Sequence, residues 1–487
     1  MKLNLIKIFK VFAVVSLITF SLLPQDKGLS HLTREFENYI SLYQKNLSIP
    51  SISAGIAAND KIIWTGAKGY TDIENFVPAT TKSVYRIASI SKSLTAIAIL
   101  QLAEQKKISL DENALKYIPY YPTKKWKFTI RQLLNHTAGI RNYKLGEFDS
   151  KDNYPSVRDA ISLIIRDSLE YEPGTKYLYT TLGYNLLAAI IETVSGMTYT
   201  DYMVKNIFIP SGMSSTFFEF QKDIIYYRAK GYTKNSYRKF QNAALADLSL
   251  KFAGGGVIST ATDLLKFSIA LLNGKLISQQ WIDSIRVPAK LKNGISVGYG
   301  LGFSISSDNK GREYIYHTGS GTGFASQLLI YPKEKIAAVQ LINCIDRNPG
   351  RPAMDLVRLY LQEVITPPLT PASDYLLTVT MNSGIDSAIT ALKALQLDSL
   401  SNIRINEDEL ILFGNDLLNI KKNGEAIILF KFVTSAFPEY FKGYIGLGEA
   451  YLKDGNKGLA LRNFRQALRL NPKNNYVSDM IKKLEGG

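Results

Sequence analysis

The chain has 487 residues, too many for one ordinary hydrophobic core, so the length predicts one large domain and at least one smaller one. Apolar residues make up 46% of the chain and charged residues 21%, a balance that excludes a disordered or a membrane-embedded protein. The net charge of +16 comes from basic residues scattered along the whole sequence. This scatter indicates a solvated basic surface, and without a nucleic-acid motif we expect no nucleic-acid partner.

Cysteine and histidine are too scarce for a metal site. Cys344 is the only cysteine, which excludes an internal disulfide and a multi-cysteine site, and its apolar surroundings indicate core packing. The three histidines, His31, His136 and His317, disfavour a zinc site of the histidine-rich type. We therefore expect chemistry that uses no metal and no other cofactor.

The N-terminus has the charge order of a secretory signal. Lys2, Lys7 and Lys10 precede an apolar stretch at 11–23 that is short for a bilayer span. We expect residues 1–25 to be a signal peptide or, because no clear cleavage site follows, an N-terminal membrane anchor. The protein is then exported to the periplasm or the extracellular space, with membrane association at its N-terminus if the segment stays uncleaved.

The elements that follow divide one sheet between two distant segments. A helix at 31–45 precedes a hairpin whose strands, 51–58 and 61–66, flank the turn Asn59-Asp60. A helical middle runs from about 89 to 288, and strands return at 300–306, 313–317, 326–331 and 336–343. With a closing helix at 353–363, residues 31–363 are predicted to form one α+β domain, an α/β sandwich of an antiparallel sheet with a mostly helical side.

The C-terminal part has the spacing of a helical repeat. Residues 364–373 contain Pro367, Pro368 and Pro371 and predict a linker, which leaves 374–487 as a separate helical domain. Eight signature positions of a tetratricopeptide repeat are filled by Tyr444, Leu447, Gly448, Tyr451, Ala460, Phe464, Ala467 and Pro472. A copy lies one repeat length earlier, from Leu410 to Pro438, and a degraded one near Ala388. The repeats predict a surface for a peptide or a protein partner, or else a stabilising appendage.

One S-x-x-K segment stands out from the others. The pattern occurs at Ser89, Ser236 and Ser307, but only Ser89-Ile90-Ser91-Lys92 opens an almost wholly apolar helix. Positions i and i+3 of a helix share a face, so Lys92 can place its amine beside the hydroxyl of Ser89. A lysine buried there is expected to have a lowered pKa and to act as a base, while the N–H groups at the helix start can receive an oxyanion.

Four ordered motifs resemble those of the serine β-lactamase and penicillin-binding protein superfamily, in particular its class C β-lactamase-like hydrolases. They are the segment 85–92 around the serine, Leu133-Leu134-Asn135-His136-Thr137-Ala138-Gly139-Ile140, Gly254-Gly255-Gly256 with Ser259-Thr260, and Tyr299-Gly300-Leu301-Gly302-Phe303. The resemblance covers about 31–363 and implies an acyl-enzyme mechanism with Ser89 as nucleophile and Lys92 beside it. The segments of His136 and of Thr260 with Asp263 are interpreted as structural.

In that family a Tyr-x-Asn segment brings a phenol to the nucleophile, and the matching residues are Tyr179-Thr180-Thr181. The resemblance implies that a phenolate-like oxygen of Tyr179, favoured by the charge of Lys92, passes a proton to the leaving group. Tyr177 and Tyr184 compete for the role. Thr181 stands where the family has asparagine, which weakens the polar hold on Lys92 and on a substrate amide.

The family's Lys-Thr-Gly strand resembles His317-Thr318-Gly319. A largely neutral histidine holds a substrate carboxylate less firmly than lysine does, which disfavours an antibiotic-degrading β-lactamase and leaves esterase or peptidase chemistry. By the same resemblance the N–H groups of Ser89 and Ser320 form the oxyanion hole. The glycine-rich 321–323 that follows fits either the close approach of a ligand or a plain turn.

We thus expect an exported serine hydrolase that acts on peptide, ester or peptidoglycan-derived stem-peptide carbonyls. The catalytic residues would be Ser89, Lys92 and Tyr179, and the substrate-binding residues Thr181, His317, Thr318, Gly319 and Ser320. The altered Thr181 and His317 motivate a rival hypothesis, a catalytically idle scaffold that binds a partner through its repeats.

Overall fold

The structure is a computed structural model that describes residues 25–346, 350, 352–397 and 401–486. The segment that the sequence predicts as a signal or anchor lies outside the described residues, apart from Gln25. Within the described residues no helix combines the length and the apolar character needed to cross a membrane.

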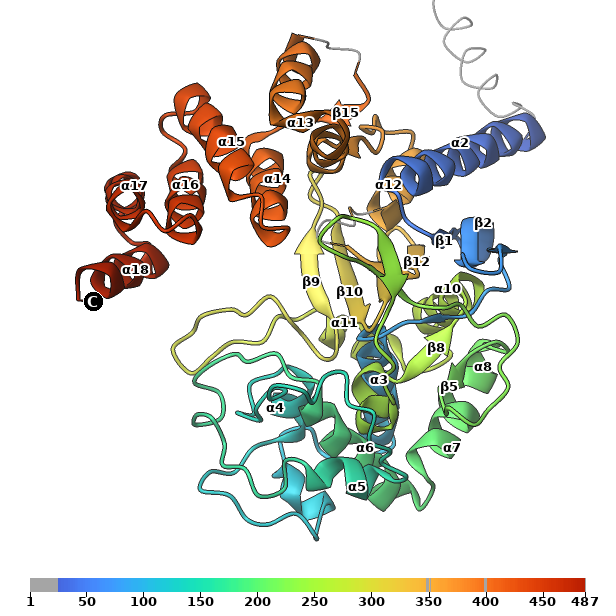
Figure 1. Cartoon of the computed structure of the whole chain (residues 1–487). Helices are drawn as coiled ribbons and strands as arrows, with labels where there is room; N and C mark the ends of the chain where they lie inside the picture. Colours follow the sequence, from blue (N-terminus) through green and yellow to red (C-terminus); the bar gives the residue numbers. More distant parts are fainter. Residues whose placement is uncertain (1–24, 347–349, 351, 398–400, 487) are drawn as a thin grey trace, which may run out of the picture.

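A seven-stranded antiparallel sheet forms the centre of the large domain, in the order β3-β2-β1-β12-β11-β10-β9 (Figure 1). The strands are β1 (Ser51–Ala58), β2 (Lys61–Asp72), β3 (Val77–Pro78), β9 (Ser304–Ser307), β10 (Glu313–Gly321), β11 (Phe324–Tyr331) and β12 (Ile336–Ile342). The N-terminal hairpin joins the late strands because β1 pairs with β12, Ile52 opposite Ile342. The predicted sheet, split across the sequence, is thereby confirmed.

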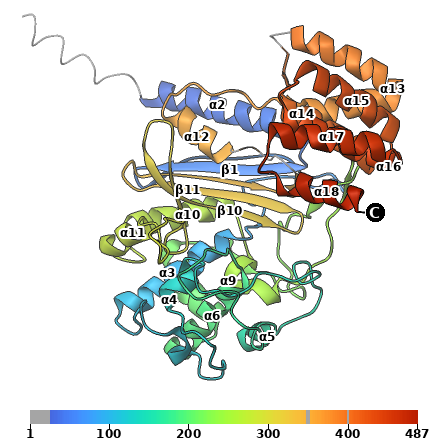
Figure 2. The same cartoon turned by 90° about the vertical axis from the view of Figure 1, so that its left-hand side faces the viewer.

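Helices cover both faces of this sheet, as Figure 2 shows with the sheet seen edge-on. On one face α2 (Gln25–Asn46) and α12 (Pro352–Tyr360) bury Phe36, Ile40 and Leu356 against the strands. On the other face α10 (Ala261–Leu272) packs against β1, β2 and β12. The alternating side chains of the central strands therefore meet apolar partners on both sides, as a three-layer sandwich requires.

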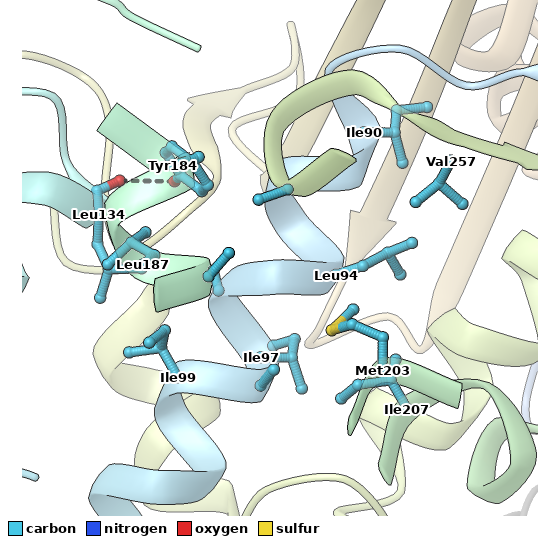
Figure 3. Close-up of a cluster of buried hydrophobic side chains, with 14 of the residues drawn as sticks. Ile90, Leu94, Ile97, Ile99, Leu134, Tyr184, Leu187, Met203, Ile207 and Val257 are labelled. Atoms are coloured by element: carbon cyan, nitrogen blue, oxygen red, sulfur yellow. Dashed lines mark hydrogen bonds between the residues drawn. The ribbon is translucent and has the colours of Figure 1, made fainter. Parts of the chain in front are cut away.

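The helical side of the domain is built around α3 (Ile90–Glu104), whose residues are buried except at its C-terminal end. Figure 3 shows Ile90, Leu94 and Ile97 of this helix among apolar side chains that include Leu187 and Val257. The surrounding helices are α4 (Ile130–Leu134), α5 (Val157–Ser162), α6 (Leu182–Ser195), α7 (Tyr199–Met203), α8 (Ile209–Ser211), α9 (Phe252–Gly255) and α11 (Gln279–Ile285), with short turns η1 (Ala114–Tyr117), η2 (Val204–Phe208) and η3 (Ser249–Lys251). A helix this apolar is stable only when it is enclosed, so α3 is a fixed support for the residues at its start.

Two small sheets tie loops to this framework. One has the order β4-β8-β5 and consists of β4 (Tyr85–Arg86), β8 (Val257–Ser259) and β5 (Phe217–Phe218). The other has the order β13-β6-β7 and consists of β13 (Cys344–Ile345), β6 (Tyr232–Lys234) and β7 (Phe240–Asn242). The first sheet fixes the segment that leads into α3.

The tail is a stack of antiparallel helices at the upper left of Figure 1. It consists of α13 (Ala372–Leu397), α14 (Glu407–Asn419), α15 (Asn423–Ala436), α16 (Phe441–Lys453), α17 (Lys457–Leu470) and α18 (Asn475–Glu485), and β14 (Thr370–Pro371) pairs with β15 (Ile403–Arg404) at its start. Gly414 leaves room for the ring of Phe430 and Gly448 for the ring of Phe464, which a Cβ would meet at 2.2 and 2.8 Å. This fit of small and large slots is the packing that the repeat spacing predicts.

Several element bounds differ from the sequence expectation. The strand expected at 300–306 begins only at Ser304, because Gly302 adopts a φ of 82° in a turn against Ala96. The strand expected to end at His317 continues to Gly321. The expected linker 364–373 is shorter, since Thr370 and Pro371 pair with β15 and α13 begins at Ala372.

Candidate active site

Ser89 lies at the junction between a strand and the buried helix α3. It is the N-cap residue of α3 and is partly accessible to solvent. The preceding Ala88 has a φ of 45°, a strained conformation that turns the chain sharply from β4 into the helix. In the part of the chain that the structure describes, the N–H of Ser89 has no hydrogen-bond acceptor. Both the hydroxyl and the amide of Ser89 therefore face a position where a substrate carbonyl can lie.

Lys92 is fully buried and points its amine at Ser89. Its Nζ lies within hydrogen-bonding distance of Ser89 Oγ at 3.0 Å, of Thr181 Oγ1 at 3.1 Å and of the carbonyl oxygen of Gly254 at 2.7 Å, so a neutral amine can donate to the last two and accept from Ser89. Burial, reinforced by the positive charge of Lys251, holds the pKa of Lys92 well below its usual value. A neutral amine can accept the proton of the Ser89 hydroxyl, so the pair has the geometry and the protonation state of a nucleophile with its base.

Of the three candidate tyrosines, Tyr179 lies closest to this pair. Lys92 Nζ is 4.8 Å from the centre of its ring and 5.7 Å from the centre of the Tyr184 ring. Tyr184 is buried and donates to the carbonyl of Leu134, and Tyr177 is 38% exposed. Burial raises the pKa of Tyr179 above its usual value, although the nearby side chain of Ser89 opposes this. The phenol thus stays protonated, which fits a proton donor better than the phenolate-like oxygen expected from the sequence.

Strand β10 passes directly behind the nucleophile. A Cβ on Gly319 would come within 2.2 Å of Ser326 Oγ and 2.3 Å of the carbonyl of Ile87, and Ser326 Oγ itself donates to that carbonyl at 2.8 Å. Only glycine fits at this position, and the contact fixes β10 against the segment that carries Ser89. Thr318 and Ser320, the neighbours of Gly319, are exposed.

The sheet geometry places the N–H of Ser320 on an open edge. β9 pairs with β10 as far as Tyr316, and Ile305 of β9 donates its N–H to Gly298, away from β10. Ile305 and Ile315 therefore form a non-hydrogen-bonded pair of the antiparallel ladder. The next residue, Tyr316, belongs to a hydrogen-bonded pair, so its backbone N–H faces β9. Because every second residue of a strand faces the same edge, Ser320 turns its N–H to the side that β9 leaves uncovered. An N–H group on an open strand edge can donate to the oxygen of a bound carbonyl.

His317 is buried and uncharged. Its Nδ1 donates to the carbonyl of Thr318 at 2.7 Å, so Nε2 accepts from the hydroxyl of Tyr299 at 3.0 Å. Burial, followed by the charge of Lys92, lowers the pKa of His317 to about 3, against the opposing hydrogen bond to Thr318. At neutral pH this residue supplies no positive charge for a substrate carboxylate.

Three further residues near the site were not expected from the sequence to take part in it. His136 lies under Tyr179 with ring centres 4.3 Å apart, and its Nδ1 accepts from the N–H of Thr180. Tyr299 holds His317, and Lys251 is a second buried lysine. The sequence signal for His136 and Tyr299 is their position in family motifs, and the His136 segment is interpreted as structural. Lys251 begins the segment 251–267, which is also interpreted as structural.

The other two S-x-x-K segments lie in turns. Ser236 to Lys239 connects β6 with β7, and Ser307 to Lys310 leads from β9 into the turn before β10. Neither segment is helical, so neither brings its lysine beside its serine through the i, i+3 geometry. Its position at the start of a helix therefore distinguishes the Ser89 segment from the other two matches to the pattern.

Family models match two parts of the sequence. The model described as Beta-lactamase matches residues 36–363, and the model described as Tetratricopeptide repeat matches residues 441–474. Among curated relatives, the serine β-lactamase-like protein LACTB, mitochondrial, of Mus musculus is 29% identical over 411 residues, which cover 64% of this chain and 74% of that protein. Penicillin-binding protein 4* of Bacillus subtilis is 28% identical over 329 residues, which cover 64% and 71%.

Solved structures share the architecture of the large domain. The octameric penicillin-binding protein homologue from Pyrococcus abyssi matches with a TM-score of 0.59 at 26% identity, over 72% of this chain and 81% of that chain. The D-amino acid amidase from Ochrobactrum anthropi SV3 matches with a TM-score of 0.57 at 22% identity, over 67% and 98%. The second similarity is one of fold alone.

Proposed function

Because the chain belongs to the β-lactamase family, we propose that it is a serine hydrolase that acts through an acyl-enzyme on peptide, ester or cell-wall stem-peptide carbonyls. The proposal rests on one observation. The partly exposed Ser89 hydroxyl lies 3.0 Å from the buried amine of Lys92, whose lowered pKa favours the neutral form. A serine and a lysine in this state are a prepared nucleophile and base.

In the proposed acylation Lys92 Nζ takes the proton of Ser89 while Oγ bonds to the substrate carbonyl carbon. The developing oxyanion accepts hydrogen bonds from the amides of Ser89 and Ser320. The protonated phenol of Tyr179 then gives a proton to the leaving group as its bond to carbon breaks, and the Lys92 ammonium returns a proton to the phenolate. Water, deprotonated by the same groups, releases the acyl chain from Ser89.

The neutral His317 bears on the substrate class. A carboxylate at the leaving-group side is held well only by a cation with matching hydrogen bonds, and burial keeps His317 uncharged. We therefore place esters and amides, including D-amino-acid amides, ahead of peptides that end in a free carboxylate next to the scissile bond. β-Lactam antibiotics, which carry such a carboxylate, are disfavoured for the same reason.

The test is hydrolysis of p-nitrophenyl acetate, a D-amino-acid amide, a stem-peptide analogue and nitrocefin by the purified full chain. We expect a burst of p-nitrophenol equal to the enzyme concentration, lost in Ser89→Ala. Ser307→Ala, the same change in a chance copy of the motif, is the matched control and should keep full activity. Hydrolysis of the ester by Ser89→Ala at the unaltered rate would instead favour the rival idle scaffold.

The repeat tail is proposed as a docking surface for a peptide segment of a protein partner, since such repeats bind extended segments along their stacked helices. Deleting residues after Pro371 should leave ester hydrolysis intact and abolish association with the partner.

We also propose that residues 1–25 direct export of the protein, to the periplasm or beyond. Truncation of these residues, followed by cell fractionation, tests this proposal.

A further inference from the structure

His136 occupies a backbone position that normally takes glycine. It follows α4, whose C-cap is Asn135, and its φ is 62°. The N–H of His136 donates to the carbonyl of Leu133 at 3.4 Å, and the N–H of Thr137 donates to that of Gln132 at 2.9 Å. These two bonds form a Schellman motif, in which the left-handed residue is usually glycine and sometimes asparagine. A histidine costs more strain here than glycine would, so the turn alone does not explain its presence.

His136 also holds the chain on both sides of Tyr179. Its carbonyl accepts from the N–H of Leu178 at 3.0 Å, and its Nδ1 accepts from the N–H of Thr180 at 3.3 Å. The two residues that flank Tyr179 are thus bonded to one histidine. The first bond needs only the backbone of His136, whereas the second needs a side-chain acceptor at this position.

The imidazole ring supports the ring of Tyr179. The centres of the two rings are 4.3 Å apart, and their planes are tilted by 43°. The ring of His136 also packs against Tyr299, with centres 4.8 Å apart, and against Tyr184, with centres 5.4 Å apart. Because protein interiors are close-packed, a ring fixed in this way restricts the positions that the Tyr179 ring can take.

The ring of His136 is neutral and leaves one polar atom without a partner. Burial, and after it the nearby Lys92 and His317, holds the pKa of His136 well below its usual value. Since Nδ1 accepts a hydrogen bond, the neutral ring carries its proton on Nε2. Within the described residues this buried Nε2 has no hydrogen-bond partner. An unpaired buried donor lowers stability, so stability alone does not explain this histidine either.

We propose that His136 is a positioning residue, which holds the Tyr179 phenol where it can give its proton to the leaving group. The inference rests on the proposed function, because that function makes Tyr179 the proton donor. His136 is 1% exposed, so it acts through Tyr179 and not on the substrate. Its Nδ1 fixes the backbone at Thr180, and its ring fixes the face of the phenol. A displacement of about 1 Å in such a group can slow a reaction about 100-fold.

This role predicts a dependence on the leaving group. p-Nitrophenolate is a stable anion that leaves without a proton, so acylation by p-nitrophenyl acetate does not need a well-placed phenol. Ethoxide is a strong base and takes up a proton as it leaves, so acylation by ethyl acetate does need one. A loss confined to the ethyl ester therefore reports on the position of Tyr179, whereas a general loss of structure slows both esters.

The experiment measures kcat/KM for the two acetates with the purified full chain, because this constant reports on acylation. His136→Gly removes the ring and the acceptor, and His136→Asn removes the ring but keeps an acceptor for the N–H of Thr180. Glycine and asparagine both suit the positive φ, so the turn after α4 is kept in each variant. His31→Asn, at an exposed position on α2, is the matched control. The burst of p-nitrophenol counts the folded sites in each preparation.

In His136→Gly we expect kcat/KM for ethyl acetate to fall about 100-fold per active site, as for the loss of a general acid. The value for p-nitrophenyl acetate should change less than about threefold. His136→Asn should recover about tenfold of the loss, because the bond to Thr180 is restored, and His31→Asn should match the wild type.

Tyr179→Phe supplies the second comparison. It should show the same pattern as His136→Gly, and combining the two changes should add less than about threefold, because the phenol that His136 positions is already absent. Equal losses for both esters, an unaltered rate with ethyl acetate, or a full further loss in the double variant would overturn the role of His136 alone. The same holds if neither His136→Gly nor His136→Asn gives a burst, since His136 is then needed for the fold. A wild type without a burst, or a Tyr179→Phe variant with unaltered rates, would overturn the proposed function and this inference with it.

Discussion

At the scale of single residues, the site is defined by which side chains are kept without charge. Lys92 and His317 are both buried, and burial disfavours the protonated form of each. In the proposed function, this lets Lys92 act as the base for Ser89. His317 without a charge offers no cation for a substrate carboxylate, so the same effect of burial underlies both the proposed nucleophile and the proposed choice of substrates.

His317→Lys tests the second consequence. We expect kcat/KM for a peptide ending in a free carboxylate to rise about tenfold relative to its amidated form, since hydrogen bonds to charged groups contribute about 1.5–3 kcal/mol. The ratio is measured with paired peptides that differ only at that end. His31→Lys, at an exposed position on α2, is the control and should leave the ratio unaltered. An unaltered ratio in both variants would contradict the assigned role of position 317.

The candidate nucleophile and base can be predicted from the sequence, whereas the residues packed around them cannot. Ser89 and Lys92 are identifiable because the local i, i+3 spacing and the apolar helix are visible in one segment. Lys251 and His136 are not, because their importance arises from contacts between segments far apart in the chain. The protonation of Tyr179 likewise depends on burial by distant elements, which no local pattern contains.

At the scale of elements, the proposed site depends on the open edge of β10, where the N–H of Ser320 has no strand opposite it. The strand was expected to stop at His317, since glycines weaken a strand pattern, yet it continues to Gly321 by pairing with β11. The glycine at 319 is what lets β10 approach Ile87 and Ala88 so closely. A weak local preference is here overridden by tertiary packing.

Gly319→Ala should push β10 away from the nucleophile. The added methyl would overlap Ser326 Oγ and the Ile87 carbonyl, so we expect about 1–3 kcal/mol lower stability from overpacking. Displacement of the Ser320 amide should also slow acylation about 100-fold. The measurements are urea unfolding and burst kinetics. The control is Gly424→Ala, where the Cβ meets no atom within 4 Å, and a normal burst rate in Gly319→Ala would contradict the account.

At the scale of the whole molecule, a cluster of four charges joins the tail to the large domain. Lys234 and Arg238, from the β6–β7 hairpin, both bind Asp346, at 2.7 and 2.6 Å. Arg238 also binds Asp374 of α13 at 2.7 Å. The sequence predicts two separate domains but not this junction, because its charges come from three segments that lie apart in the chain. The buried cluster indicates that the tail is held in a fixed place.

Asp374→Asn should loosen the tail. Removing one partner from a largely buried ion cluster leaves charge uncompensated, which we expect to lower stability by about 1–3 kcal/mol. Scanning calorimetry should show the tail melting before the catalytic domain, with ester hydrolysis retained below that transition. Asp386→Asn, at an exposed position on α13, is the control. A single unshifted transition in Asp374→Asn would show that the cluster does not hold the tail.

The central claim is that Ser89 is the nucleophile, and covalent labelling tests it most directly. The full chain is treated with a fluorophosphonate probe, and the modified residue is located by peptide mass spectrometry. We expect one adduct, on Ser89, that is absent from Ser89→Ala and strongly reduced in Lys92→Met. No adduct on the wild-type chain, or an adduct on a different residue that persists in Ser89→Ala, would contradict it.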